Sequence, residues 1–72
     1  MNVSRTDFEY MREGLVRDML TILVEERGLS LADAFARLYK SETFSKMSAP
    51  ETGLYFQSPR YVLSYLDAET SC

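Results

Sequence analysis

Apolar residues near the start of the chain recur at intervals of three and four, the spacing of one side of an α-helix. That side carries Phe8, Met11, Leu15, Met19, Ile22 and Leu23. A second stripe at a spacing of four, Val16, Leu20 and Val24, widens the apolar arc to roughly 200°, about twice what a surface helix needs. Both sides of this helix must therefore be covered, either by later parts of the same chain or by another molecule.

Local signals predict where this first helix begins and ends. Thr6 and Glu9 have the spacing of a capping box, in which a hydroxyl accepts from a helical amide and a carboxylate reaches back. Gly28 marks the other end, because glycine readily adopts the left-handed conformation that closes helices. We therefore predict a helix over residues 7–27.

Serine residues mark the start of three further helices. Ser30 and Ser41 each precede a segment with helical periodicity, and serine is a favoured capping residue. Ser58 is followed by Pro59, which is well tolerated at the first helical position because the missing N–H costs nothing there. These signals predict helices over 31–40, 42–47 and 59–69.

Residues 48–57 contain turn-forming residues and are predicted to be irregular. Pro50 presets one φ angle, and Gly53 accepts a positive φ without strain. Leu54 to Gln57 suit at most one short edge strand, since no second strand-like segment is present to pair with it. The predicted fold is therefore one all-α domain over residues 1–72, a bundle of three main helices and one short helix.

Residue composition argues against catalysis. The chain has no histidine and a single cysteine, Cys72, so it lacks the usual general base and the usual zinc ligands. Glu25 and Glu26 are adjacent, and neighbouring helical side chains point ~100° apart, so they do not converge on one proton. An enzyme built on these glutamates or on a tyrosine would need a site assembled between subunits. We predict no enzymatic activity, no cofactor and no metal site.

The charge of the chain is also informative. Eight basic and 11 acidic side chains give a net charge of −3, which provides no positive field for collecting phosphates. The longest apolar run, Ile22 to Val24, is far shorter than the ~20 residues that span a bilayer. We expect a cytoplasmic protein that binds neither membranes nor, in general, nucleic acids.

Two groups of residues are candidates for an interface. The first is the second apolar stripe of the first helix, Val16, Leu20 and Val24, which either belongs to the core or meets a partner. The second is aromatic, because tyrosine combines rigid apolar area with a hydroxyl that tolerates water, and it comprises Tyr55, Phe56, Tyr61 and Tyr65. A core of this size supplies only about 3–5 kcal/mol, so a protein partner or self-association into a homo-oligomer is expected.

Three stretches of the sequence carry a resemblance to a known family. They are Leu29-Ser30-Leu31-x-x-Ala34, then Leu38-Tyr39-x-Ser41-Glu42-Thr43-Phe44-x-Lys46-Met47-Ser48, and Glu51-Thr52-Gly53-Leu54-Tyr55-Phe56-Gln57-Ser58-Pro59-x-Tyr61-Val62. Over residues 15–66 the chain resembles a family of short uncharacterised bacterial proteins, a domain of unknown function, sometimes encoded beside ADP-ribosyltransferase-like toxins. The resemblance implies a bacterial cytoplasmic protein that is the antitoxin-like or accessory member of a pair, and it brings no catalytic residues.

The sequence thus predicts a non-enzymatic protein–protein interaction module, antitoxin-like in its preferred version. The alternative is a small helix-turn-helix regulator that binds DNA as a homo-oligomer through residues 30–46, because the turn at Gly28 joins two helices as in that motif. Residues 29–48 carry 3 basic and 2 acidic side chains, a net charge of +1 that is small for a DNA-binding surface.

Overall fold

The computed structural model describes residues 5–70, and the regular structure in that range is entirely helical. Its elements are α1 (Arg5–Glu25), α2 (Leu31–Tyr39), α3 (Glu42–Met47), the short 3₁₀ helices η1 (Pro50–Thr52) and η2 (Leu54–Phe56), and α4 (Pro59–Thr70). This confirms the predicted all-α fold. Cys72 lies outside the described residues.

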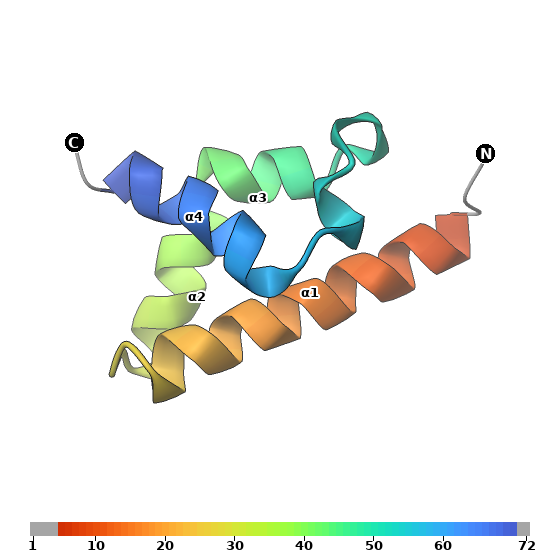
Figure 1. The fold of residues 1–72 in the computed structure, drawn as a ribbon. Helices are drawn as coiled ribbons and strands as arrows, with labels where there is room; N and C mark the ends of the chain where they lie inside the picture. The colour runs from red at the N-terminus through yellow and green to blue at the C-terminus, as the bar shows by residue number, and fades with distance from the viewer. Residues whose placement is uncertain (1–4, 71–72) are drawn as a thin grey trace.

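The long helix α1 runs along one edge of the molecule, and all the other helices lie to one side of it (Figure 1). It contacts α2, η2 and α4, while α3 packs between α2, α4 and the 3₁₀ helices. Side chains without solvent exposure fill the space between these elements. They are Met19, Leu23, Ala34, Leu38, Met47, Val62 and Leu66.

Both ends of α1 differ from the prediction. The chain is already helical at Arg5, so Thr6 lies inside the helix and is not its cap. Arg5 Nε lies 3.4 Å from Glu9 Oε2, and this i,i+4 ion pair supports the first turn of the helix. Regular α-helix ends at Glu25, two residues before the predicted end. Gly28 then takes a φ of 73°, as expected of a residue that reverses the chain after a helix.

The later helices begin where the serine signals predict. Observed bounds match the prediction for α3 and differ by one residue at the C-terminal ends of α2 and α4. The hydroxyl oxygens of Ser30, Ser41 and Ser58 accept hydrogen bonds from the amides of Asp33, Phe44 and Tyr61 at 3.1, 3.0 and 3.2 Å. Each hydroxyl satisfies an amide that the first turn of a helix leaves without a partner.

The segment between α3 and α4 forms two 3₁₀ turns where the sequence suggested, at most, an edge strand. Gly53 joins them with a φ of 73°, and a Cβ atom at this position would lie 3.3 Å from the ring of Phe56. The amide of Gln57 donates to the carbonyl of Leu54 at 3.1 Å. Local bonds of this kind satisfy a backbone segment that has no neighbouring strand to pair with.

Candidate functional site

A groove of about 640 Å³ lies along α1, where α2 and α3 pack beside it. Its floor is the second apolar stripe of α1, Val16, Leu20 and Val24. One wall is formed by α2 and α3, which contribute Leu31, Phe35, Tyr39 and Phe44. The groove thus brings together apolar residues from three helices.

The floor of the groove is covered only in part. Leu20 is buried among the core residues, whereas Val16 and Val24 are half-buried and pack against the edge of the core. The side chains of this stripe therefore contact the core on one side and line the groove on the other. This position follows from the spacing of four, which turns the stripe slightly away from the side that carries Met19 and Leu23.

The wall of the groove is aromatic. The ring centroids of Phe35 and Tyr39 lie 5.2 Å apart, and those of Tyr39 and Phe44 lie 4.7 Å apart in an edge-to-face arrangement. Such pairs hold rings in a fixed orientation. Leu31 and Tyr39 nevertheless remain 57 % and 46 % exposed. Leu31, Phe35 and Tyr39 follow one another at a spacing of four and so share one face of α2, but this spacing alone does not identify that face as part of a site.

Charged residues border the groove along α1. They are Arg12, Glu13, Arg17 and Glu25, with Thr21 between the last two. Arg12 is held in place, because its guanidinium lies 5.7 Å from the centroid of the Phe8 ring and donates to Ser48 Oγ at 3.2 Å. Arg17 Nε lies 3.5 Å from the carboxylate of its neighbour Asp18. The groove is therefore an apolar surface with a mixed-charge border.

The second candidate group, the aromatic residues near α4, is divided between the core and the surface. Tyr55 is only 7 % exposed, because its ring packs edge-on against Phe8 with centroids 4.8 Å apart, so it contributes to the core. Phe56, Tyr61 and Tyr65 remain exposed. Among the described residues, Phe56 has a ring contact with Tyr55, while Tyr61 and Tyr65 contact each other.

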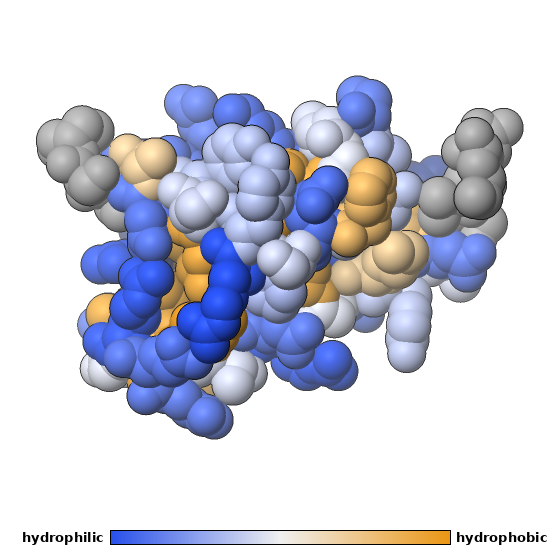
Figure 2. Space-filling model, viewed as in Figure 1, coloured by the Kyte–Doolittle hydropathy of each residue, from blue (hydrophilic) through white to orange (hydrophobic). Residues whose placement is uncertain are grey.

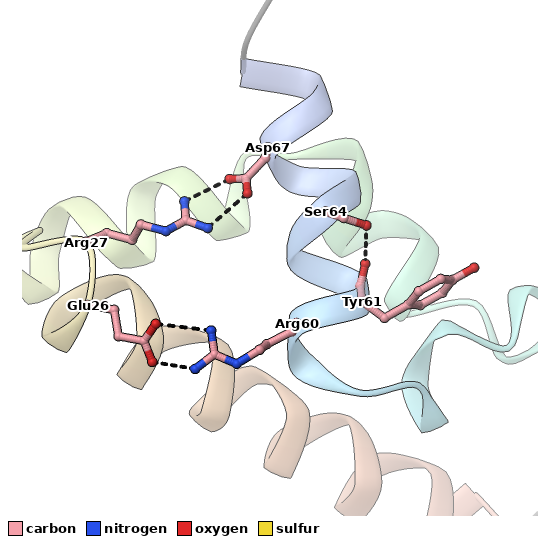
Figure 3. Close-up of polar contacts among 6 residues, drawn as sticks. All are labelled: Glu26, Arg27, Arg60, Tyr61, Ser64 and Asp67. Atoms are coloured by element: carbon pink, nitrogen blue, oxygen red, sulfur yellow. Dashed lines mark hydrogen bonds and ion pairs between the residues drawn. The ribbon is translucent and has the colours of Figure 1, made fainter.

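Tyr61 and Tyr65 form an isolated pair on the surface of α4. Their hydroxyl oxygens lie 3.1 Å apart and share a hydrogen bond, which raises the pKa of Tyr61 above its ordinary value. The hydroxyl of Ser64 donates to the carbonyl of Tyr61 at 2.5 Å (Figure 3). These contacts lie within one helix.

Two ion pairs join α4 to the end of α1, on the side away from the groove. Arg60 donates to both oxygens of Glu26 at 3.1 and 2.5 Å, and Arg27 donates to both oxygens of Asp67 at 3.0 and 2.9 Å (Figure 3). These bonds lower the pKa of Glu26 and of Asp67 and raise the pKa of both arginines. In Figure 2, hydrophilic side chains lie over hydrophobic ones between α4 and this end of α1.

Glu69, near the end of α4, caps the start of α3. Its carboxylate accepts from the amide of Glu42 at 2.8 Å, the amide of Thr43 at 2.7 Å and the hydroxyl of the buried Thr43. The Thr43 hydroxyl, followed by the two amides, lowers the pKa of Glu69. No local pattern in the sequence indicates this contact, because the residues are 26 and 27 positions apart.

The basic residues of the DNA-binding alternative lie beside acidic ones. Arg37 and Lys40 are exposed on α2 and border a shallow hollow that Glu69 also lines. The charge of Arg37 contributes to lowering the pKa of Asp67. Neighbouring carboxylates of this kind weaken the positive field that a phosphate backbone would meet.

Between residues 5 and 70, the acidic side chains form no cluster of three or more that is suited to holding a metal ion. The described helices include none with the length and apolar content needed to cross a membrane. The chain matches no protein-family model, no curated protein and no solved structure. The groove along α1 is therefore the feature of the described residues from which function is best argued.

Proposed function

We propose that the chain is a non-enzymatic protein–protein interaction module whose binding surface is the groove of α1, α2 and α3. One observation carries this proposal: Leu31 and Tyr39, large side chains 57 % and 46 % exposed, lie in the same hollow as the half-buried Val16 and Val24. Burying apolar surface contributes about 25 cal/mol per Å², so a gathered apolar surface favours association.

The chemistry of the groove suits a protein segment better than a small molecule. Small-molecule sites combine apolar walls with a few polar groups that converge on the ligand and fix its orientation. In this groove the polar side chains, Arg12, Glu13, Arg17 and Glu25, border the apolar floor along the length of α1. An amphipathic helix fits such a surface, since its apolar face meets the floor and its polar flanks meet the border.

In the preferred version of the proposal the partner is the product of a neighbouring bacterial gene, and the chain acts in the cytoplasm as the antitoxin-like or accessory member of the pair. The support is the resemblance over residues 15–66. Covering a groove on a toxin requires a stable apolar surface and no active site. The net charge of −3 suits a partner with a basic surface, because opposite charges speed the encounter.

Co-purification of the tagged chain with the neighbouring gene product tests the proposal when it includes two variants. Leu31→Glu places a charge in the groove, and the fold tolerates it because Leu31 is the first residue of α2, where a carboxylate favours the helix dipole. Tyr10→Glu is the control, because Tyr10 is 79 % exposed and does not line the groove. We expect the first variant to bind at least about tenfold more weakly and the control to bind normally.

Failure of the wild-type chain to bind the neighbouring protein contradicts the antitoxin-like version. Equal binding by Leu31→Glu and Tyr10→Glu contradicts the assignment of the groove. A titration with duplex DNA addresses the alternative function, and we expect no binding. Affinity that falls steeply with salt and depends on Arg37 and Lys40 would favour the helix-turn-helix regulator instead.

A further inference from the structure

We infer that a second copy of the chain occupies the groove in the free protein, with the two α1 helices packed antiparallel around a two-fold axis beside Leu20 and Thr21. This inference rests on the proposed function, because it names the occupant of the same groove. It is carried by the order of residues along α1. The apolar row is symmetric about Leu20 and the charged row about Thr21, and these two centres lie one residue, or about 1.5 Å, apart along the helix axis.

The apolar floor of the groove is self-complementary. Val16 and Val24 each lie four residues from Leu20, on opposite sides of it. Antiparallel pairing with the axis between residues 20 and 21 places Leu20 of one copy nearly level with Leu20 of the other, and Val16 nearly level with Val24. Residues of similar size then meet at each level of the interface, so both grooves bury their floors together.

The neighbouring row of α1 is self-complementary in charge. Glu13, Arg17, Thr21 and Glu25 follow one another at a spacing of four and line the groove beside its floor. A two-fold axis perpendicular to the pair of helices keeps this row on the same side in both copies. Arg17 of one copy therefore lies opposite Glu25 of the other, twice per dimer, and Thr21 lies opposite its counterpart.

Those two charges are available for such a pairing. The Arg17 side chain is 76 % exposed and Glu25 is exposed, so both reach beyond the surface of α1. Glu13 lies eight residues from Thr21, and its counterpart position is Leu29, so no like charge meets it. Parallel pairing would instead place Arg17 beside Arg17 and Glu25 beside Glu25, which is repulsive. The charges thus favour a second, antiparallel copy.

The mass of the protein in solution gives the first test. Light scattering or sedimentation equilibrium should give twice the chain mass of 8.3 kDa for the wild-type protein at micromolar concentrations. Leu31→Glu and the charge variants below should shift it toward the single-chain mass, while Tyr10→Glu should not. A wild-type protein that stays at the single-chain mass up to about 100 μM overturns the inference, since its dimer would be no tighter than weak encounter complexes.

Charge exchange gives the sharper test, because it predicts both loss and recovery. Arg17→Glu places two carboxylates opposite each other at each of these contacts, and Glu25→Arg places two guanidinium groups there. Each variant alone should therefore dimerise about tenfold more weakly. The double variant, with both changes in one chain, restores two opposite-charge pairs and should dimerise like the wild type. An equimolar mixture of the two single variants should form heterodimers for the same reason.

These outcomes separate the inference from the proposed function. Single variants that dimerise as well as the wild type, with helical circular dichroism unchanged, overturn the antiparallel pairing. If the protein has the single-chain mass but binds the neighbouring protein, and Leu31→Glu abolishes this binding, the dimer inference is overturned and the proposed function is supported. A dimer that obeys the charge exchange but does not bind the neighbouring protein supports the inference and contradicts the antitoxin-like function.

Discussion

The two long sides of α1 carry similar residues but have different surroundings. On one side, Phe8, Met19 and Leu23 are buried beneath the other elements of the chain. On the other side, Val16 and Val24 are half-buried and border an open groove. Residue type alone therefore does not decide burial in this helix. The later segments of the chain cover one side, and the opposite side is left partly open.

The charged residues of the two sides also differ. On the covered side, Glu26 and Arg27 reach across to Arg60 and Asp67 of α4 and tie the helices together. On the groove side, Arg17 lies beside Asp18, its neighbour in sequence, so the contact links no second helix. Arg12, which also borders the groove, donates to Ser48 and so serves the fold, whereas the ion pair of Arg17 ties no two helices together.

The largest difference between the two sides should appear when the same truncation is made on each. Leu23→Ala removes a side chain with 0 % exposure and should lower the free energy of unfolding by about 2–5 kcal/mol. Leu31→Ala removes a side chain that is 57 % exposed and should lower it by less than about 0.5 kcal/mol in the monomer. Urea denaturation followed by circular dichroism, at dilution that keeps the chain monomeric, measures both. Similar losses for the two variants would show that the groove side is as much a part of the core.

Acid should weaken the contacts that α4 makes with α3 and with the turn that follows α1. The bonds described above hold the pKa values of Glu26, Asp67 and Glu69 below their ordinary values in the folded chain. Their contribution to stability is therefore complete above the unfolded-state values of about 4, and it is lost as the pH falls through the lower folded-state values. Because no histidine is present, stability should be nearly constant between about pH 5.5 and 7, a range above the pKa values of carboxyl groups and below those of amines and the thiol.

The urea midpoint measured as a function of pH checks this expectation, and Glu69→Gln is the informative variant. It lacks one of the three perturbed carboxyls, so its midpoint should fall less steeply below pH ~4 than that of the wild type. Exposed Glu51→Gln serves as the control and should follow the wild-type curve. If the urea midpoints of Glu69→Gln and the wild type fell equally steeply below pH ~4, the result would argue against the cap that Glu69 provides for α3.

The smallest effect should come from the ion pairs themselves. A double-mutant cycle of Arg27→Gln and Asp67→Asn should give a coupling free energy of about 0.5 kcal/mol, because both side chains remain partly in water. Added salt should reduce this coupling, since the Debye length falls to about 3 Å at 1 M. A coupling that is large and indifferent to salt would mean that this edge of the core excludes water.

The sequence predicts the parts of the fold that depend on short-range chemistry. Hydroxyls at Ser30, Ser41 and Ser58 cap helices because their amide partners lie three residues away. The same reasoning failed at Thr6, where a capping pattern lies within a helix that is already formed at Arg5. A local signal of this kind identifies a possible helix start, but it does not exclude continuation of the helix toward the N-terminus.

The sequence predicted the floor of the groove but not its wall, because the wall depends on contacts between distant parts of the chain. Periodicity singled out Val16, Leu20 and Val24, since an overfull apolar arc is visible in one helix alone. The wall residues Leu31, Phe35, Tyr39 and Phe44 join them only through the angle at which α2 and α3 meet α1, which no short stretch of sequence specifies. Tyr55 shows the opposite error: the sequence suggested an interface residue, but its ring is buried against Phe8, which lies far away in the sequence.

The cap that Glu69 provides for α3 has a consequence for how the chain acquires its structure during synthesis. Helix α3 has only six residues, too few to persist alone in water, and two of its first amides bond to a carboxylate made 26 and 27 residues later. During translation, α3 therefore lacks its hydrogen bonds to Glu69 until that residue has been made. Helix α3 therefore gains its full set of N-terminal hydrogen bonds only after the last turn of α4 has emerged from the ribosome.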